Sequence, residues 1–351
     1  MEKRKRNSET AGAAAQGGTP AGSRKHAAEP QGRRMERGAV APGSAWALVT
    51  GAGSGIGRCY ALRLAALGYR LVIAGDNRAP LEAVAEEIRN ARPAGRKAAA
   101  KEPEAAEGSE VAKKSKVAEG LGVAASADGS GAPGREPAAA IAEATGEPGA
   151  ETDGNGAQEL YDRMTAEGIV VDVVINNAGI FSFCDILATP AERIERIILL
   201  HDLTVTQLCR LFAADMVRRG VRGHILNMSS YSLWMPFPGL ALYSASKAYM
   251  RSFSVAFAKE VRERGIRVTA VCPAGVATDL YGLTPYWQRI GRKLGVLITP
   301  DSCARRGLKA LWKGRRCIVP DWWNRAWIPF CKVLPMWVLR PVRRFTMKFQ
   351  K

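Results

Sequence analysis

The feature that most constrains this 351-residue chain is a glycine-rich stretch near residue 50. Residues Thr50–Gly57 read TGAGSGIG. They follow an apolar run at 46–49 and precede apolar residues at helical spacing. Glycines allow a tight turn and a close approach to a ligand, and the following helix offers unpaired N–H groups and a positive dipole end to an anion. Strand, turn and helix in this order predict a site for the pyrophosphate of a dinucleotide. A tight turn without a ligand is the alternative.

Three further motifs follow the glycine turn in order. The stretch Asn176–Gly179 (NNAG) comes after a β-branched run, Ser230 comes after another apolar segment, and Tyr243 and Lys247 stand four residues apart. With the glycine turn, these motifs resemble the short-chain dehydrogenase/reductase family of the classical type. The 13-residue spacing from Ser230 to Tyr243 fits that family. The resemblance implies an NAD(P)-dependent oxidoreductase that acts on a carbonyl or a secondary alcohol.

Tyr243 and Lys247 are the residues that we expect to handle the proton. On a helix they share one face because they are four residues apart. A free tyrosine has a pKa near 10, and we expect the nearby ammonium and a positive nicotinamide ring to lower that pKa. Tyr243 would then act as general acid or base, Ser230 would hold the substrate oxygen, and Lys247 would also bind the nicotinamide ribose, as in the family. A surface tyrosine and lysine without catalytic roles are the alternative.

One position departs from the family pattern. The family has an asparagine in the helix before the serine strand, and that asparagine anchors a water leading to the lysine. Here Asp202 stands in its place. We expect Asp202 to complete the catalytic set, with its charge pairing with Lys247 and changing the proton relay. A helix residue without a catalytic part is the alternative.

The resemblance also assigns residues that would contact the cofactor. Asp76, at the end of the second strand, would accept hydrogen bonds from a ribose 2′-hydroxyl and repel a 2′-phosphate, which favours NAD(H) over NADP(H). Arg78, two residues later, could instead serve a phosphate. The full set of expected cofactor contacts is Gly51, Ser54, Gly55, Ile56, Gly57, Asp76, Asp153, Asn177, Ala178, Gly179, Tyr243, Lys247, Pro273, Val276 and Thr278.

Strands alternate with helices along the chain, which predicts an α/β fold with a Rossmann-like doubly wound parallel sheet flanked by helices. The family resemblance covers about residues 45–90 and 157–285, and we expect a single domain at 45–321. Residues 1–44 lack apolar periodicity and are expected to form a disordered basic tail.

The segment 91–150 is expected to be a low-complexity surface insertion. It contains no aromatic residue and is rich in Ala, Gly, Pro, Glu and Lys, so it cannot bury enough apolar surface to offset its ordering entropy. The insertion falls where the family has its third strand. We place the end of that strand at Asp153, which stands 23 residues before Asn176 and fits the family better than Asp128.

The formal charge of +18 is concentrated toward the C-terminus, where residues 285–351 hold six of the eight tryptophans. We expect the basic Trp-rich segment 322–351 to contact an anionic membrane surface. A helix docked on the domain or in a dimer interface is the alternative. No apolar run reaches the length of a membrane span. We expect no nucleic-acid partner, because the basic run Lys3–Arg6 is better explained as a solvated charge run.

The composition also limits compartment and metal content. Seven cysteines without a CxxC pair indicate reduced thiols and a cytoplasmic location, and three scattered histidines indicate no metal site. Apolar residues after Thr278, such as Tyr286 and Trp287, suggest a lipophilic substrate. The tail is similar to those of family members that reduce 3-oxoacyl or 3-ketosphinganine substrates. We expect a homodimer or homotetramer. A non-catalytic scaffold that binds membrane or nucleic acid through its basic end is the alternative function.

Overall fold

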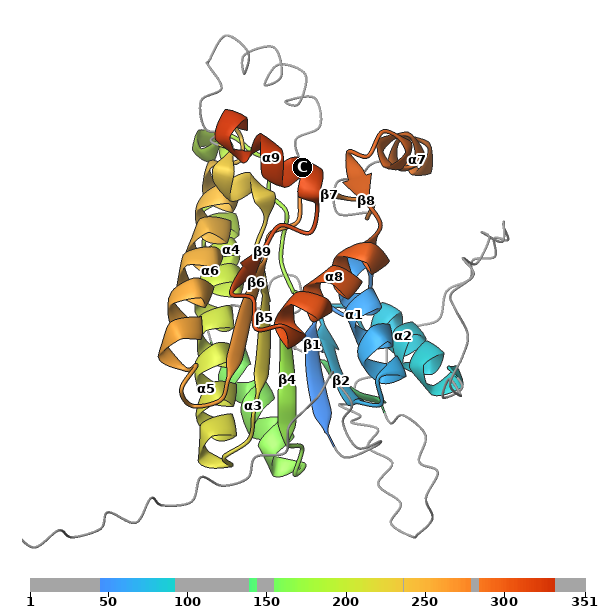
Figure 1. Ribbon diagram of the computed structural model, residues 1–351, viewed down its shortest axis with the longest axis vertical. Coiled ribbons are helices and arrows are strands. Elements are labelled where there is room, and N and C mark those ends of the chain that lie inside the picture. Colours follow the sequence, from blue (N-terminus) through green and yellow to red (C-terminus); the bar gives the residue numbers. More distant parts are fainter. Residues whose placement is uncertain (1–44, 92–138, 144–154, 236, 279–283, 332–351) are drawn as a thin grey trace, which may run out of the picture. The chain divides into compact units, whose positions relative to one another are not determined.

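A parallel sheet forms the centre of the protein, whose computed structural model describes residues 45–91, 139–143, 155–235, 237–278 and 284–331. Within these residues the sheet has the strand order β3-β2-β1-β4-β5-β6-β9, and all its neighbours pair in parallel (Figure 1). The order reverses between β1 and β4, which is where α/β folds of this kind place their ligand crevice. The predicted fold class is therefore confirmed. The strands are β1 Trp46–Thr50, β2 Arg70–Gly75, β3 Ala139–Glu143, β4 Val171–Asn176, β5 His224–Met228, β6 Arg267–Val271 and β9 Cys317–Ile318, and β7 Gly275–Val276 pairs separately with β8 Leu297–Ile298.

Helices cover both faces of the sheet because the strand side chains alternate between two buried clusters. Ala47 and Val49 of β1 belong to the cluster with α1, α2 and α8, whereas Trp46 and Leu48 belong to the cluster with α3, α5 and α6 (Figure 1). Both faces are apolar, as expected for a parallel sheet. The helices of the first face are α1 Gly55–Ala66, α2 Arg78–Asn90 and α8 Pro300–Trp312, and those of the second are α3 Gly156–Ala166, α5 Val205–Arg218 and α6 Ala241–Glu260.

The second face contains a helix with an unusual segment in its middle. The helices α4 (Ala191–Ile198) and α5 are joined by a π-helical segment, η2 (Leu199–Thr204), which holds Asp202. Such π segments are rare and occur often at functional sites. By length and composition alone, the helix formed by residues 191–218 could cross a membrane, although we expected no segment of that kind. In the structure, 39% of its most apolar stretch is buried in the domain. Core helices pass the same test.

The third strand corrects a prediction. β3 lies inside the segment that we expected to be a structureless insertion, and it pairs with β2 from Leu71↔Ala139 to Gly75↔Glu143. Its sequence, AAIAE, has only one β-branched residue, so strand propensity gives no signal, whereas pairing with β2 satisfies its backbone. The placement of the strand end at Asp153 was wrong. Asp153 itself and residues 92–138 lie outside the described part of the chain.

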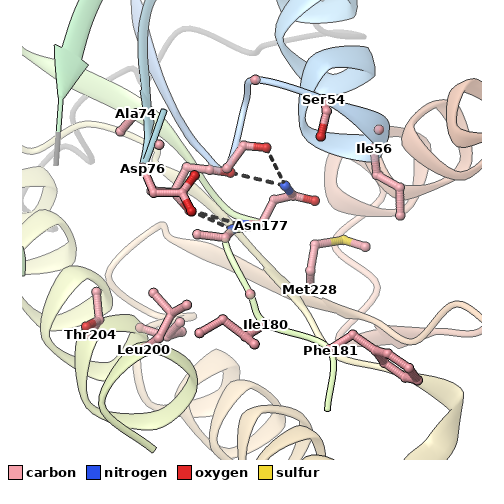
Figure 2. Close-up of a pocket in the computed structure, with 18 of the residues that line it drawn as sticks. Ser54, Ile56, Ala74, Asp76, Asn177, Ile180, Phe181, Leu200, Thr204 and Met228 are labelled. Atoms are coloured by element: carbon pink, nitrogen blue, oxygen red, sulfur yellow. Dashed lines mark hydrogen bonds between the residues drawn. The ribbon is translucent and has the colours of Figure 1, made fainter. Parts of the chain in front are cut away.

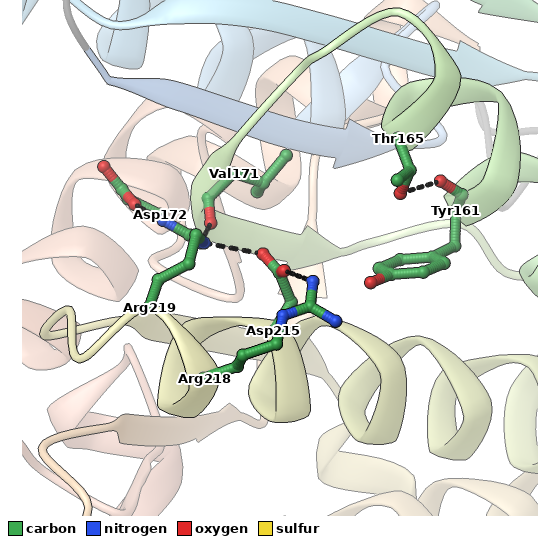
Figure 3. A network of polar contacts seen from close by, with 7 residues as sticks. All are labelled: Tyr161, Thr165, Val171, Asp172, Asp215, Arg218 and Arg219. Carbon is green, nitrogen blue, oxygen red and sulfur yellow. Dashed lines mark hydrogen bonds and ion pairs between the residues drawn. The ribbon is translucent and has the colours of Figure 1, made fainter.

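At the amino-terminal end of the central strand β4, a polar network holds α5 in place (Figure 3). The Arg219 guanidinium contacts the Asp215 carboxylate at 2.7 Å, the Asp172 carboxylate at 3.1 Å and the Val171 carbonyl oxygen at 2.6 Å. Arg218 also pairs with Asp215. The network ties the last turn of α5 to the start of β4 and leaves the opposite end of β4, with its Asn176–Gly179 turn, free to line a cavity.

Several shorter elements complete the described chain. They are η1 Ile186–Ala188, η3 Tyr231–Trp234, α7 Pro285–Lys293 and α9 Trp322–Cys331. The start of α9 is docked, because the Tyr231 hydroxyl donates to the Asn324 carbonyl oxygen at 2.8 Å. This contact agrees with the docked-helix alternative for the beginning of the C-terminal segment. Residues 332–351 lie outside the described part.

Candidate functional site

A cavity of about 820 Å³ opens at the carboxyl ends of the central strands (Figure 2). It brings together most of the residues predicted from the motifs. Gly57 and Asp202 do not line it, and Asp153 is not described. The predicted residues that line the cavity are Gly51, Ser54, Gly55, Ile56, Asp76, Asn177, Ala178, Gly179, Ser230, Tyr243, Lys247, Pro273, Val276 and Thr278.

The glycine turn is shaped by close backbone approaches. Gly51 has a φ of +63°, and a Cβ there would lie 2.8 Å from the Ala178 Cα. A Cβ on Gly57 would lie 2.0 Å from the Gly51 carbonyl oxygen. Both positions therefore exclude any larger residue. Gly57 acts from behind the cavity wall, since it sets the distance between the helix α1 and the turn.

Asn177 links the glycine turn to the turn after β4. Its amide nitrogen donates to the carbonyl oxygens of Thr50 at 3.2 Å and Gly51 at 3.0 Å (Figure 2). In return, the Thr50 hydroxyl oxygen accepts from the backbone N–H groups of Asn177 and Ala178, each at 3.0 Å. Two motifs that are far apart in the sequence thus form one rigid wall.

The N-terminus of α1 fits an anionic ligand. Ser54 precedes the helix in an extended conformation, and its side chain makes no capping hydrogen bond, so the first N–H groups of α1 have no side-chain acceptor there. The first turn contains no acidic residue. With the glycines that keep the approach open, this geometry suits the pyrophosphate of a dinucleotide.

Ser230 and Tyr243 line the same cavity. Tyr243 is buried, and burial raises its pKa to about 12, while the Ser230 hydroxyl opposes the rise. We had expected Lys247 to lower this pKa. In the protein alone the loss of hydration at the phenolate outweighs the ammonium, whose nitrogen lies 5.7 Å from the ring centre.

Lys247 is buried beneath the tyrosine. Its ammonium donates to the Met228 carbonyl oxygen at 3.1 Å and lies 3.4 Å from the Met250 sulfur. Burial lowers its pKa to about 8, and the charge of Asp202 opposes that fall. Lys247 therefore remains mostly protonated at neutral pH, although its ammonium has few polar partners.

Asp202 faces Lys247 from the π-helical segment. Burial raises the pKa of its carboxyl to about 6, and Lys247 opposes the rise. Its Oδ1 atom is buried and has no hydrogen-bond partner among the described residues. The two groups influence each other by charge, and Asp202 does not line the cavity.

His201 is the site residue that our sequence reasoning missed. Its imidazole is fully buried, and it contacts both the turn after β4 and the helix that carries Tyr243. A signal for it was present: a histidine directly after the apolar run 197–200, inside a helix, must find buried partners.

The apolar residues expected around the substrate lie elsewhere. Tyr286 and Trp287 of α7 are 64% and 58% exposed and do not line the cavity. The apolar wall comes instead from Ile180, Phe181 and Leu200 (Figure 2). The Phe181 ring meets the Tyr243 ring edge to face, with 5.1 Å between their centres. Substrate carbons beside Tyr243 would therefore meet an aromatic surface.

Known proteins are similar to this chain over most of its described length. The family model described as short chain dehydrogenase matches residues 45–119 and 107–288. Probable oxidoreductase EphD of Mycobacterium tuberculosis is 34% identical over 38% of this chain and 23% of that protein. Very-long-chain 3-oxoacyl-CoA reductase of Anas platyrhynchos is 30% identical over 70% of this chain and 64% of that protein. The chain thus spans less than two thirds of the length of either relative.

Solved structures show the same fold. The bulky-bulky ketone specific alcohol dehydrogenase from Comamonas testosteroni has a TM-score of 0.58 at 20% identity, covering 88% of this chain and 96% of that one. A short-chain dehydrogenase from Sphingobium yanoikuyae, in complex with NADPH, has a TM-score of 0.58 at 23% identity, covering 88% and 97%. 4-Hydroxyisoleucine dehydrogenase, complexed with NADH, has a TM-score of 0.57 at 17% identity, covering 79% and 97%.

Proposed function

The chain belongs to the short-chain dehydrogenase family, and from that premise we propose that it transfers hydride between NAD(H) and the carbonyl carbon of a lipophilic ketone, or the reverse from a secondary alcohol. One observation carries the proposal. Ser230 and Tyr243 line the same cavity as Lys247 and the glycine turn. A carbonyl oxygen placed between two hydroxyl donors is polarised toward hydride attack.

The residues take distinct roles in this reaction. When bound, the nicotinamide ring supplies or accepts the hydride. The N-terminus of α1 binds the pyrophosphate, and Lys247 holds the nicotinamide ribose. Ser230 donates a hydrogen bond to the substrate oxygen and orients it, and Tyr243 delivers the proton to that oxygen during reduction or removes it during oxidation. The buried Lys247 stabilises the phenolate that remains.

We propose NAD(H) as the preferred cofactor because the nearby arginines are engaged. Asp76 lines the cavity. The Arg58 guanidinium makes two contacts to the Glu87 carboxylate, at 2.9 and 2.5 Å, and Arg78 pairs with Glu82 at 2.6 Å. The cavity therefore presents a carboxylate to the ribose, while both arginines are held by acids of α2.

The cofactor proposal is tested by Asp76→Ala. We expect its ratio of NADP(H) to NAD(H) affinity to rise about tenfold, because the change removes both a ribose acceptor and a repelling charge. Fluorescence titration of the reduced dinucleotides measures both constants. An unchanged ratio would show that Asp76 does not reach the ribose.

We propose a lipophilic substrate, of the 3-oxoacyl or sphingoid type, from the wall formed by Ile180, Phe181 and Leu200. The test is turnover of 3-oxoacyl-CoA compounds and long-chain ketones beside short ketones, followed by absorbance of the reduced cofactor. We expect kcat/KM to rise with chain length, since each buried methylene adds about 0.8 kcal/mol. Dinucleotide binding without turnover of any carbonyl would favour the scaffold alternative.

We also propose contact with an anionic membrane surface. The segment from α7 to β8 exposes Tyr286, Trp287, Leu294 and Val296. Its three charged residues are all basic, and all three lie in α7. Exposed aromatic and aliphatic side chains among cations suit an interfacial contact. The full chain should sediment with anionic vesicles and less with neutral ones. Trp287→Ala should weaken this binding, whereas Leu187→Ala, at a residue that is even more exposed but lies outside the segment, should not.

Self-association is the remaining proposal. Tyr249 of α6 is 42% exposed and stacks on Phe253, while Leu203 and Val217 are 39% and 37% exposed. These apolar groups on two adjacent helices support a homodimer or homotetramer. Sedimentation velocity over a range of protein concentrations distinguishes these states from a monomer.

A further inference from the structure

His201 lies at the point where the cofactor turn and the catalytic helix come together. It occupies the π-helical segment η2, and its side chain is completely buried. One ring nitrogen, Nε2, accepts a hydrogen bond from the Ile180 backbone N–H at 3.0 Å. The other, Nδ1, lies 2.9 Å from the Ser246 hydroxyl oxygen. The imidazole therefore bridges a loop after β4 and a turn of α6.

The hydrogen bonds determine the tautomer of this histidine. Because Nε2 accepts from a backbone N–H, the proton of the neutral ring sits on Nδ1 and is donated to Ser246. The Ser246 hydroxyl in turn donates to the carbonyl oxygen of Tyr243 at 3.0 Å. Burial, with a smaller effect of Lys247, lowers the pKa of His201 to about 2. The ring thus stays neutral at working pH, and the direction of each bond is constant.

A second observation shows how tightly this junction is packed. Gly179 lies next to Ile180 and lines the cavity. A Cβ on Gly179 would stand 3.0 Å from the His201 Nε2 atom and 3.3 Å from the Lys247 ammonium nitrogen. The backbone at Gly179 therefore packs closely against both the imidazole and the lysine ammonium. A shift of the imidazole would move both the turn and the catalytic helix.

We propose that His201 is a positioning residue that holds the 178–180 turn at a constant distance from Tyr243, through Ile180 on one side and Ser246 on the other. Its side chain does not line the cavity. Its action is to keep the nicotinamide side of the cavity in register with the hydroxyl that handles the proton. Hydride transfer depends steeply on such alignment, since a displacement of about 1 Å can cost on the order of a hundredfold in rate. The role rests on the proposed oxidoreductase activity.

Two conservative variants separate the two sides of the bridge. In His201→Asn, the amide nitrogen can take the place of Nδ1 and keep the bond to Ser246, but the side chain is too short to reach Ile180. In His201→Gln, the amide oxygen can take the place of Nε2 and keep the Ile180 bond, while the donor to Ser246 is displaced. The proposal therefore expects opposite losses in the two variants.

The measurements are kcat and the dissociation constant of the dinucleotide. We expect His201→Asn to weaken dinucleotide binding about tenfold with a smaller fall in kcat. We expect His201→Gln to leave binding within about threefold and to lower kcat by roughly tenfold to a hundredfold. Ser246→Ala should resemble His201→Gln, and combining the two should add little, because both interrupt the same path.

The matched control is His224→Gln, a second buried histidine that packs against Trp312 at the opposite end of β5. The His224→Gln variant should have a lower melting temperature, and it should not change kcat and dinucleotide affinity by different factors. Hydrogen exchange gives a readout independent of catalysis: the Ile180 amide should lose protection in His201→Asn and keep it in His201→Gln. Equal losses of kcat and affinity in both His201 variants, or unchanged Ile180 exchange, would overturn the positioning role. A wild-type chain that neither binds a dinucleotide nor reduces a carbonyl would instead overturn the proposed function.

Discussion

The two halves of the cavity are built by different means. The cofactor half is held by backbone contacts, such as the approach of Gly51 to Ala178, and by amide hydrogen bonds from Asn177. The catalytic half depends on buried polar side chains, of which Tyr243, Lys247 and Asp202 all have pKa values displaced by burial. Steric constraints tolerate changes of pH but not of side-chain size, whereas buried ionisable groups respond to both charge and pH.

The largest effect should come from the catalytic half. Tyr243→Phe removes the hydroxyl that handles the proton and leaves the ring packed against Phe181. We expect kcat to fall by about 10²- to 10⁴-fold, with dinucleotide affinity nearly unchanged. Stopped-flow turnover and fluorescence titration measure the two quantities. Retention of more than about a tenth of the wild-type kcat would remove Tyr243 from its role as proton donor.

A steric change in the cofactor half should weaken dinucleotide binding, whereas Tyr243→Phe lowers kcat. In Gly57→Ala, the new Cβ would lie 2.0 Å from the Gly51 carbonyl oxygen and 2.5 Å from the Asn177 amide nitrogen. Relieving these contacts costs about 1–3 kcal/mol, and we expect dinucleotide affinity to fall about tenfold to a hundredfold with little dependence on pH. The control Gly156→Ala adds a Cβ with nothing within 4 Å. If both variants bind the dinucleotide like the wild type, the close approach is not required.

A charge change in the catalytic half should act through pH. Burial lowers the pKa of Lys247 to about 8, and the Asp202 carboxylate opposes this fall. Asp202→Asn should therefore lower the pKa of Lys247 below about 8. If the protonated lysine is required, the alkaline limb of the kcat/KM profile moves to lower pH by about 1 unit. An alkaline limb at the wild-type pH would show that the charge of Asp202 does not support the lysine.

The same variant has a second, smaller signature in stability. The pKa of Asp202 is raised from 3.8 to about 6 in the folded protein, so the folded state binds the extra proton between these values. The wild type should therefore lose stability as pH rises through this window, because the buried carboxyl must ionise. Asp202→Asn should lack this loss and gain about 1 kcal/mol relative to wild type above pH 6, after allowing for solvent screening. Urea unfolding at pH 4.5 and 7.5 measures the difference.

The same contrast explains what could be predicted from the sequence. The glycine turn and the NNAG turn are local motifs whose steric demands are visible in a few consecutive residues, and the structure places both around one cavity. The apolar run before His201 could have marked it as buried, but its partners, Ile180 and Ser246, lie 21 and 45 residues away, and no local pattern identifies them. Strand β3 was missed because an alanine-rich strand at the sheet edge owes its existence to pairing with β2 rather than to its own propensity.

The smallest effect should come from replacing the segment before β3, which follows α2 at the edge of the cofactor half. Replacing residues 92–138 by a Gly-Ser linker long enough to join α2 to β3 keeps the pairing of Gly75 with Glu143, and thus the support of β2 beside Asp76. We expect dinucleotide affinity and kcat to stay within about twofold, because the free-energy cost of closing a Gly-Ser linker depends only weakly on its length. Extending the deletion to 91–150 also removes β3 and leaves an edge of β2 unpaired. That variant should bind the dinucleotide more weakly than the shorter deletion, and equal affinities in the two would show that β3 does not contribute to the cofactor half.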